Sequence, residues 1–224
     1  MNTFWPRGTV YGSLLNFHAE LASLGEQVHA APYMAAPLAP VLYVKTANTW
    51  SANGSDVALP AGASQLEVGA TIAMVIGAPV FGAQASRAHC RVAGYVLAND
   101  LCVPHASFYR PPVKAKCPDG LFGVGPAMVS AGQAGEPARW VLEVRINGAL
   151  RQSVDFAGLQ RDAATLLADV SGFMTLQPGD WLLLGCAAGR PLAGPGDRVE
   201  IRVANRAEFG VLVNRLAEHR LEAA

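Results

Sequence analysis

The alternation of apolar and polar positions along the chain predicts a fold built mainly from β-strands. In residues 199–203, Val199, Ile201 and Val203 alternate with Glu200 and Arg202, which is typical of a strand with one buried face. Apolar runs bounded by Gly, Pro and Asn predict a set of strands at 41–45, 66–76, 92–98, 140–146, 181–184, 198–204 and 209–214.

Local signals also predict one hairpin and two helices. Asn147-Gly148 lies between apolar runs at 141–146 and 150–154, and it favours a type I′ turn because both residues tolerate positive φ. A helix over about 158–171 is predicted by one apolar stripe of Leu159, Ala163, Leu166, Leu167 and Val170. A shorter helix is expected over 17–24, ending at Gly25. These elements predict a mixed α+β fold in one domain over 1–224, dominated by a twisted β-roll with few short helices.

Composition narrows the class of protein. Of 224 residues, 51% are hydrophobic and 15% are charged, which allows a large core and indicates that a partner covers part of the surface. The net charge is zero and there is no Lys/Arg run, which argues against binding to nucleic acid or an anionic membrane. No apolar run is long enough to span a bilayer and the first residues lack a signal-peptide pattern, so a cytoplasmic location is expected. The four cysteines have no C-x-x-C spacing and are expected to be reduced.

Three segments carry the residues with candidate chemistry. They read L-E-V-G-A-T-I-A-M-V-I-G at 66–77, V-A-G-Y-V-L-A-N-D at 92–100, and K-C-P-D-G at 116–120 followed by V-G-P at 124–126. This order resembles the fumarylacetoacetate hydrolase (FAH) family. The resemblance covers about residues 8–215 and implies the FAH-type β-roll or sandwich. Within the family, the chain is most similar to decarboxylases and isomerases of 4-hydroxyphenylacetate catabolism, and there to their amino-terminal half or first subunit.

The resemblance implies a metal centre that this chain has altered. The family carries an E-x-E pair on a strand, where side chains two apart face the same way and, with an aspartate, form an oxygen cradle for Mg²⁺ or Mn²⁺. Aligned on V-I-G, the two glutamates fall on Gly69 and Thr71, and Asp100 remains as the metal ligand. One carboxylate and a hydroxyl hold a divalent cation poorly, so weak or absent metal binding is expected. A rearranged site of Glu67, Asp100 and His105 is the alternative.

The implied substrates are small 2-oxo or 2-hydroxy-dienoic polycarboxylates, which react through a metal-stabilised dienolate. Lys116, before the Asp-Gly pair, is expected to be catalytic, binding a substrate carboxylate or stabilising the enolate. Lys45 at a strand end, Arg110 in S-F-Y-R-P and Thr71 are expected to bind substrate. The alternative roles are a solvated loop lysine for Lys116, an edge lysine for Lys45 and a structural salt bridge for Arg110.

The segment L-N-F-H-A-E at 15–20 resembles the family's lid, whose H-x-x-E dyad transfers protons as the lid closes. His18 and Glu20 are therefore candidate catalytic residues. Neither possible alignment restores both members of the dyad, and an ordinary helix-surface histidine is the alternative for His18. The family's G-x-T-P-x-G turn appears here as G-C-A-A-G at 185–189.

Two functional hypotheses follow from the resemblance. In the first, the chain is an enzyme subunit that decarboxylates 5-oxopent-3-ene-1,2,5-tricarboxylate and isomerises 2-hydroxyhepta-2,4-diene-1,7-dioate. In the second, it is a non-catalytic structural partner that docks on a paralogous FAH-family subunit with intact metal ligands. An acylpyruvate-type hydrolase is a further enzymatic alternative. A homodimer, or a heterodimer with such a paralogue, is the expected assembly.

Overall fold

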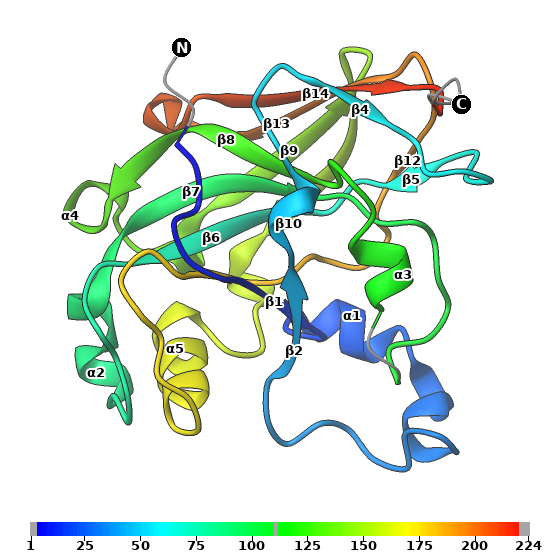
Figure 1. Cartoon of the computed structure of the whole chain (residues 1–224). Helices are drawn as coiled ribbons and strands as arrows, with labels where there is room; N and C mark the ends of the chain where they lie inside the picture. The colour runs from blue at the N-terminus through cyan, green and yellow to red at the C-terminus, as the bar shows by residue number, and fades with distance from the viewer. Residues whose placement is uncertain (1–3, 110–111, 220–224) are drawn as a thin grey trace.

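Two β-sheets form the framework of the computed structural model, which describes residues 4–109 and 112–219 (Figure 1). The larger sheet has the strand order β2-β1-β11-β6-β7-β8-β3, the second has the order β10-β9-β13-β14-β4, and β12 pairs with β5 separately. The strands are β1 Val10–Leu14, β2 Val41–Lys45, β3 Trp50–Ser51, β4 Asp56–Ala58, β5 Leu66–Glu67, β6 Ala70–Ile76, β7 Val92–Asp100, β8 Phe122–Ser130, β9 Val141–Ile146, β10 Ala149–Asp155, β11 Trp181–Leu183, β12 Leu192–Ala193, β13 Arg198–Val203 and β14 Val211–Ala217.

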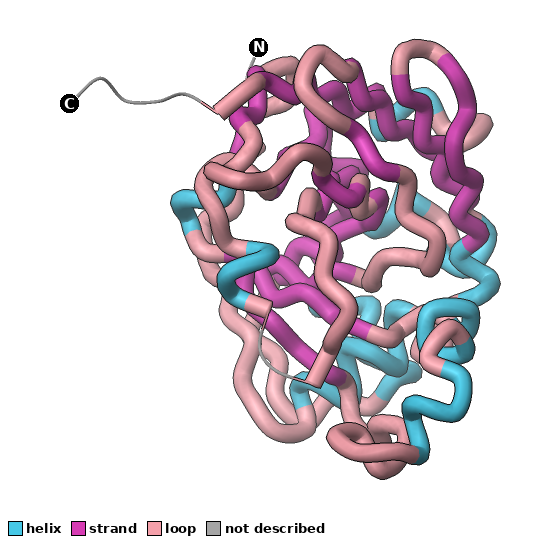
Figure 2. The backbone as a smooth tube through the Cα atoms, turned by 90° about the vertical axis from the view of Figure 1, so that its right-hand side faces the viewer, coloured by secondary structure: helices cyan, strands magenta, loops and turns pink. Residues whose placement is uncertain are grey.

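The helices are short and most lie toward one end of the molecule (Figures 1 and 2). They are α1 His18–Ala22, α2 Ala85–Ala88, α3 Val113–Lys116, α4 Ala131–Ala134 and α5 Ala163–Ser171, with 3₁₀ turns at Gly25–His29, Ala47–Thr49, His89–Arg91, Pro137–Arg139, Phe156–Gly158 and Ala207–Phe209. α2 lies against α5 below β6 and β7. Within the described residues, none of these helices has the length and apolar character needed to cross a membrane.

The two faces of β6 belong to two different hydrophobic clusters. Ile72 and Met74 join the main core, together with residues of β9, β13 and α5. Ala73 and Val75 face the other way and pack with residues of β7 and β11. A strand buried on both faces reads as an unbroken apolar run, and this explains why alternation is missing from residues 70–76.

The predicted sheet-rich α+β fold with few short helices is confirmed, whereas its division into one domain over 1–224 stays a prediction. The hairpin is also confirmed, since Asn147 and Gly148 have φ of 52° and 81°. The strand predicted at 66–76 is interrupted, because β5 pairs with β12 while β6 pairs with β7. The helix predicted from 158 begins at Ala163, where the Asp162 side chain accepts a hydrogen bond from Thr165 N at 2.7 Å.

A substitution at Trp140 tests the packing of the main core. Trp140 is 1% exposed, its ring lies 4.9 Å from Tyr95 and 5.3 Å from Phe209 between centroids, and its indole Nε1 donates to the Ala134 carbonyl. Trp140→Ala should lower the free energy of unfolding by about 3–5 kcal/mol, measured by urea denaturation. Leu150→Ala, at a residue that is 51% exposed, is the control and should change it by less than about 0.5 kcal/mol. Equal effects of the two changes would contradict this assignment of the core.

Candidate functional site

Asp100 ends β7 in the interior, where its carboxylate is held by two lysines and a tyrosine. Lys116 Nζ lies 2.5 Å from Oδ2, and Lys45 Nζ lies 3.1 Å from Oδ1. The Tyr43 hydroxyl also donates to Oδ2. Asp100 is fully buried and both lysines are only 1% exposed. The carboxylate is therefore neutralised by side chains of the protein itself, away from water.

Three segments that are distant in sequence bring these groups together. Tyr43 and Lys45 are two apart on β2, so their side chains point to the same side of that strand. Gly12 is paired with Tyr43 on the neighbouring strand, and a Cβ at Gly12 would lie 2.0 Å from the tyrosine ring, so the missing side chain makes room for Tyr43. Lys116 comes from the end of α3, which packs near β2 on the same side of the molecule (Figure 1).

The ammonium group of Lys45 is fully engaged inside the protein. It donates to the carbonyl oxygens of Leu121 at 2.8 Å and Leu101 at 3.3 Å, and to that of Lys116. With Asp100, four acceptors surround three N–H groups. Burial lowers the pKa of Lys45, and the neighbouring Asp100 offsets part of that effect. The structure places Lys45 in an internal ion pair, and its expected role in binding substrate stays a prediction.

Lys116 differs from Lys45 because, among the described residues, its ammonium donates only to Asp100. It also lies 4.5 Å from the centroid of the Tyr43 ring, a cation–π contact. Burial is the largest single effect and would lower the pKa of Lys116, but Asp100 together with smaller effects of Cys102 and Cys186 raises that pKa. Burial likewise opposes ionisation of Asp100, yet Lys116 and Lys45 hold the pKa of Asp100 well below its usual range. The pair is thus a stable ion pair, with donor capacity remaining on Lys116.

A second ion-pair cluster adjoins the first. Arg190 lies between two glutamates, with Nη2 3.3 Å from Glu20 Oε1 and Nε 3.1 Å from Glu67 Oε2. The other carboxylate oxygen of Glu20 accepts a hydrogen bond from Leu15 N at 2.7 Å. Glu20 is 2% exposed, and burial raises its pKa although Arg190 acts in the opposite direction. The charges of Lys116 and Asp100 also act on Glu20, so the structure brings this predicted residue to the site.

Other predicted site residues have different surroundings. His18, at the first position of α1, is exposed and stays apart from the charged clusters. Thr71 is fully buried and its hydroxyl donates to the Gly185 carbonyl at 2.6 Å, so its proton is not free for a substrate. Arg110 lies outside the described residues.

Tyr43 and Arg190 are site residues that sequence reasoning missed. Tyr43 could have been found from its spacing of two from Lys45 on a predicted strand. Arg190 follows the 185–189 turn directly, and no local pattern marks its role, because both of its partners come from distant segments.

The residues at this site do not fit a divalent cation. Each oxygen of Asp100 already lies against an ammonium group, so two cations of the protein occupy the carboxylate that Mg²⁺ or Mn²⁺ would use. A Cβ at Gly69 would lie 2.3 Å from the Asp100 carbonyl oxygen, so a glutamate cannot be added there on this backbone. Within the described part of the chain, no three His, Cys, Asp or Glu side chains are grouped to hold a metal.

The alternative metal site of Glu67, Asp100 and His105 is not assembled either. Glu67 is paired with Arg190, and His105 Nδ1 lies 3.3 Å from Cys102 Sγ and 3.2 Å from the Val103 carbonyl oxygen. Burial lowers the pKa of His105. Weak metal binding by this chain stays a prediction that requires a binding measurement.

Comparison with known proteins places these features in a family. Residues 9–217 match the family model described as Fumarylacetoacetate (FAA) hydrolase C-terminal. The chain belongs to the fumarylacetoacetate hydrolase family. The 4-hydroxyphenylacetate degradation bifunctional isomerase/decarboxylase of Escherichia coli is 36% identical over 87% of this chain and 44% of that protein. The chain therefore spans less than half the length of this relative.

Solved structures of the family share the fold of this FAH-family chain. The 5-carboxymethyl-2-hydroxymuconate delta-isomerase from Mycobacterium smegmatis superposes with a TM-score of 0.77 at 27% identity, covering 95% of this chain and 80% of that chain. Fumarylpyruvate hydrolase from Pseudomonas aeruginosa, solved with Mn²⁺ and pyruvate, has a TM-score of 0.80 at 22% identity, covering 95% of this chain and 90% of that chain. At that identity the second likeness concerns the fold alone.

A substitution at Gly69 tests whether the backbone between β5 and β6 lies as close to the Asp100 backbone as the structure shows. Gly69→Ala should lower the free energy of unfolding by about 1–3 kcal/mol, because the nearest atom to the new Cβ is the Asp100 carbonyl oxygen, which belongs to the backbone. Gly132→Ala in α4 is the matched control, since nothing lies within 4 Å of its added Cβ, and it should be neutral or stabilising by up to about 1 kcal/mol. Urea denaturation measures both, and a neutral Gly69→Ala would refute the close approach.

The buried ion pairs predict a specific dependence of stability on pH. Because the pKa of Asp100 is depressed in the folded protein, its contribution is complete above the unfolded-state pKa of about 3.9 and is lost as the pH falls below that value. At pH 7, Asp100→Asn should lower the free energy of unfolding by about 3–5 kcal/mol, since it leaves two buried ammonium groups without a counter-charge.

The difference between wild type and Asp100→Asn should therefore shrink when urea denaturation is repeated at low pH. Asp56→Asn, at an exposed strand position, is the control and should change stability by less than about 0.5 kcal/mol at pH 7. A difference that is the same at neutral and low pH would show that Asp100 is not an ionised partner of the lysines.

Proposed function

We propose that this chain is a component of an isomerase/decarboxylase of 4-hydroxyphenylacetate catabolism that acts on small 2-oxo or 2-hydroxy polycarboxylates. Support comes from family membership and from two Escherichia coli relatives with these activities in their names, at 36% and 35% identity. The chain spans 44% of each, and in this proposal a second FAH-family chain supplies the remainder.

We further propose that the metal centre of the enzyme belongs to the partner subunit, and that this chain is its structural partner. The observation that carries this proposal is the internal neutralisation of Asp100 by Lys45 and Lys116. A carboxylate with an ammonium group against each oxygen and no exposure to solvent offers no open position to a metal and its substrate. The metal-stabilised dienolate expected from the resemblance is therefore not routed through this site.

A second candidate function is catalysis by the chain's own residues, and two observations favour it. Lys116 retains donor capacity for a substrate carboxylate or enolate oxygen. A cavity of about 280 Å³ is lined by Lys116, Tyr43 and Val113, so a small ligand reaches the neighbourhood of the lysine. In this case Glu20, whose pKa is raised by burial, would accept or return the proton.

An activity assay separates the two candidates. Decarboxylation of 5-oxopent-3-ene-1,2,5-tricarboxylate with Mg²⁺ would be followed for this chain, for a FAH-family chain with an intact E-x-E pair, and for their mixture. The structural-partner proposal predicts no activity from this chain alone, a complex in analytical ultracentrifugation, and greater activity of the mixture than of the second chain alone. Calorimetry of this chain with Mg²⁺ alone should show no saturable binding.

Lys116→Met supplies the matched test, with Lys114→Met at an exposed position of the same helix as its control. Under the structural-partner proposal, a variant that still assembles with the second chain should give a mixture whose activity is within about twofold of the wild-type mixture. This holds for Lys116→Met and for Lys114→Met. Activity of the isolated chain that falls by about 10²-fold or more in Lys116→Met and not in Lys114→Met would overturn that proposal in favour of the second candidate.

A further inference from the structure

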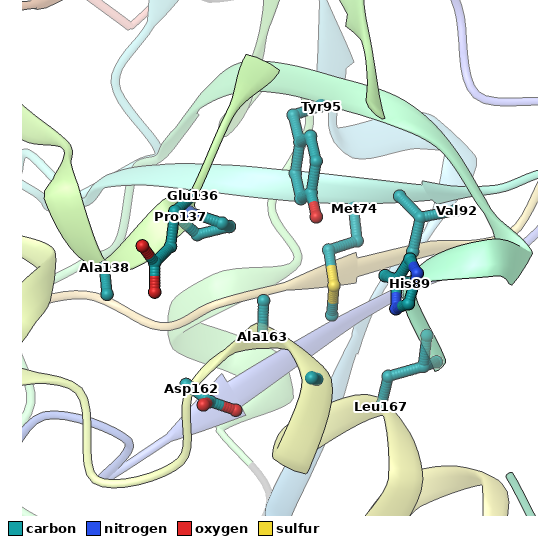
Figure 3. Close-up of a pocket in the computed structure, with 11 residues that line it drawn as sticks. Met74, His89, Val92, Tyr95, Glu136, Pro137, Ala138, Asp162, Ala163 and Leu167 are labelled. Carbon is teal, nitrogen blue, oxygen red and sulfur yellow. The ribbon is translucent and has the colours of Figure 1, made fainter. Parts of the chain in front are cut away.

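A second cavity lies away from the Asp100 cluster, between β6, β7 and the beginning of α5 (Figure 3). Its volume is about 160 Å³, and Met74, Val92 and Leu167 contribute much of its apolar wall. Tyr95 lies on the same strand as Asp100 but five positions earlier, so this cavity is not part of the charged site. The family features discussed above assign it no role.

Tyr95 gives the cavity a polar group without a partner. The residue is 5% exposed, and its ring is held edge-on against Trp140 with centroids 4.9 Å apart. Within the described residues its hydroxyl has no hydrogen-bond partner, and Figure 3 shows it directed into the cavity beside Met74. Burial raises the pKa of Tyr95, so the hydroxyl keeps its proton. The hydroxyl can therefore donate a hydrogen bond to a ligand with an acceptor atom, a contribution of about 0.5–1.5 kcal/mol.

The charges at the rim decide what kind of ligand can enter. Glu136, Asp162 and His89 line the cavity; Arg139 pairs with Glu136 at 3.1 Å, and Arg161 is engaged with Asp169 at 2.8 Å. One Asp162 oxygen caps α5. No lysine or arginine lines the cavity, and Asp162 has no basic partner among the described residues, so the cavity is unsuited to the polycarboxylates proposed for the enzyme.

The volume of the cavity and the side chains that line it limit the possible ligands further. An apolar cavity of about 150 Å³ accommodates a benzene-sized molecule in other proteins. The Met74 thioether offers a favourable contact to an aromatic ring. We propose that this cavity binds a neutral, phenol-sized aromatic molecule whose hydroxyl oxygen accepts a hydrogen bond from Tyr95. This site is independent of the proposed decarboxylase and isomerase function.

The proposal is tested by titrating the full chain with phenol, benzene and benzoate, followed by protein NMR. Phenol should produce saturable shifts at residues of β6, β7 and α5. It should bind at least about fivefold more tightly than benzene, as one added hydrogen bond implies, and benzoate should bind more weakly than either neutral probe. Benzoate as the tightest ligand, or shifts located elsewhere, would overturn the proposal, as would no saturable shift up to the solubility limit of phenol.

Variants identify the group responsible. Tyr95→Phe keeps the ring and removes the hydroxyl, so phenol and benzene should bind it equally. Tyr109→Phe, at a residue that is 56% exposed, should behave as wild type. Ala164→Met, at a half-buried position lining the cavity, should fill the space and weaken both neutral probes. Circular dichroism and urea denaturation confirm that each variant is folded, and an undiminished preference of Tyr95→Phe for phenol would refute the role of Tyr95.

Discussion

A carboxylate enclosed by protein needs positive charge within a few ångströms, and in this chain Asp100 obtains it from Lys45 and Lys116. The same two lysines connect separate parts of the fold. Lys45 joins β2 to the carbonyl groups after β7 and before β8, and Lys116 brings the end of α3 against Tyr43. Removing Asp100 would leave two buried cations, so this interaction underlies the geometry of the whole site.

The Asp100 cluster differs from a metal centre both in the charges around the carboxylate and in the space left beside it. Two ammonium groups carry the same charge as one divalent cation, but they occupy the carboxylate that a cation would use. Gly69 then allows the Asp100 backbone to approach where a side chain would otherwise stand. The absence of the E-x-E glutamates is thus physically compatible with the ion pairs that Lys45 and Lys116 form with Asp100. This supports a division of labour in which one FAH-family subunit stabilises and another carries out the metal-dependent step.

Two environments of opposite character lie along β7. At its end, ammonium and guanidinium groups pair with Asp100 and Glu20 in a buried charged cluster. Five residues earlier, Tyr95 faces an apolar cavity whose rim carries Glu136 and Asp162, a setting suited to neutral molecules. A single buried strand can separate the two because its successive side chains leave toward opposite faces of the sheet.

The amino-acid sequence by itself determined the elements whose signals are local. The strand at 41–45, the Asn147-Gly148 turn and the sheet-rich class were predicted because side-chain period and turn conformation depend on neighbouring residues. β8 at 122–130 was missed because its glycines and proline hide the strand pattern. Asp100, Lys116 and Glu20 were named as site residues from the resemblance, and the structure brings them near one another, whereas His18 stays at the surface.

Only the tertiary structure decided which charges pair. Lys45 was expected to bind substrate, yet its acceptors come from residues 55 to 76 positions away, and Arg190 meets Glu20 and Glu67 from a distant loop. No periodicity along the chain encodes such contacts, because an ion pair in the interior depends on where whole strands pack. For the same reason the Tyr95 cavity, formed where α5 meets β6 and β7, has no counterpart in the sequence pattern.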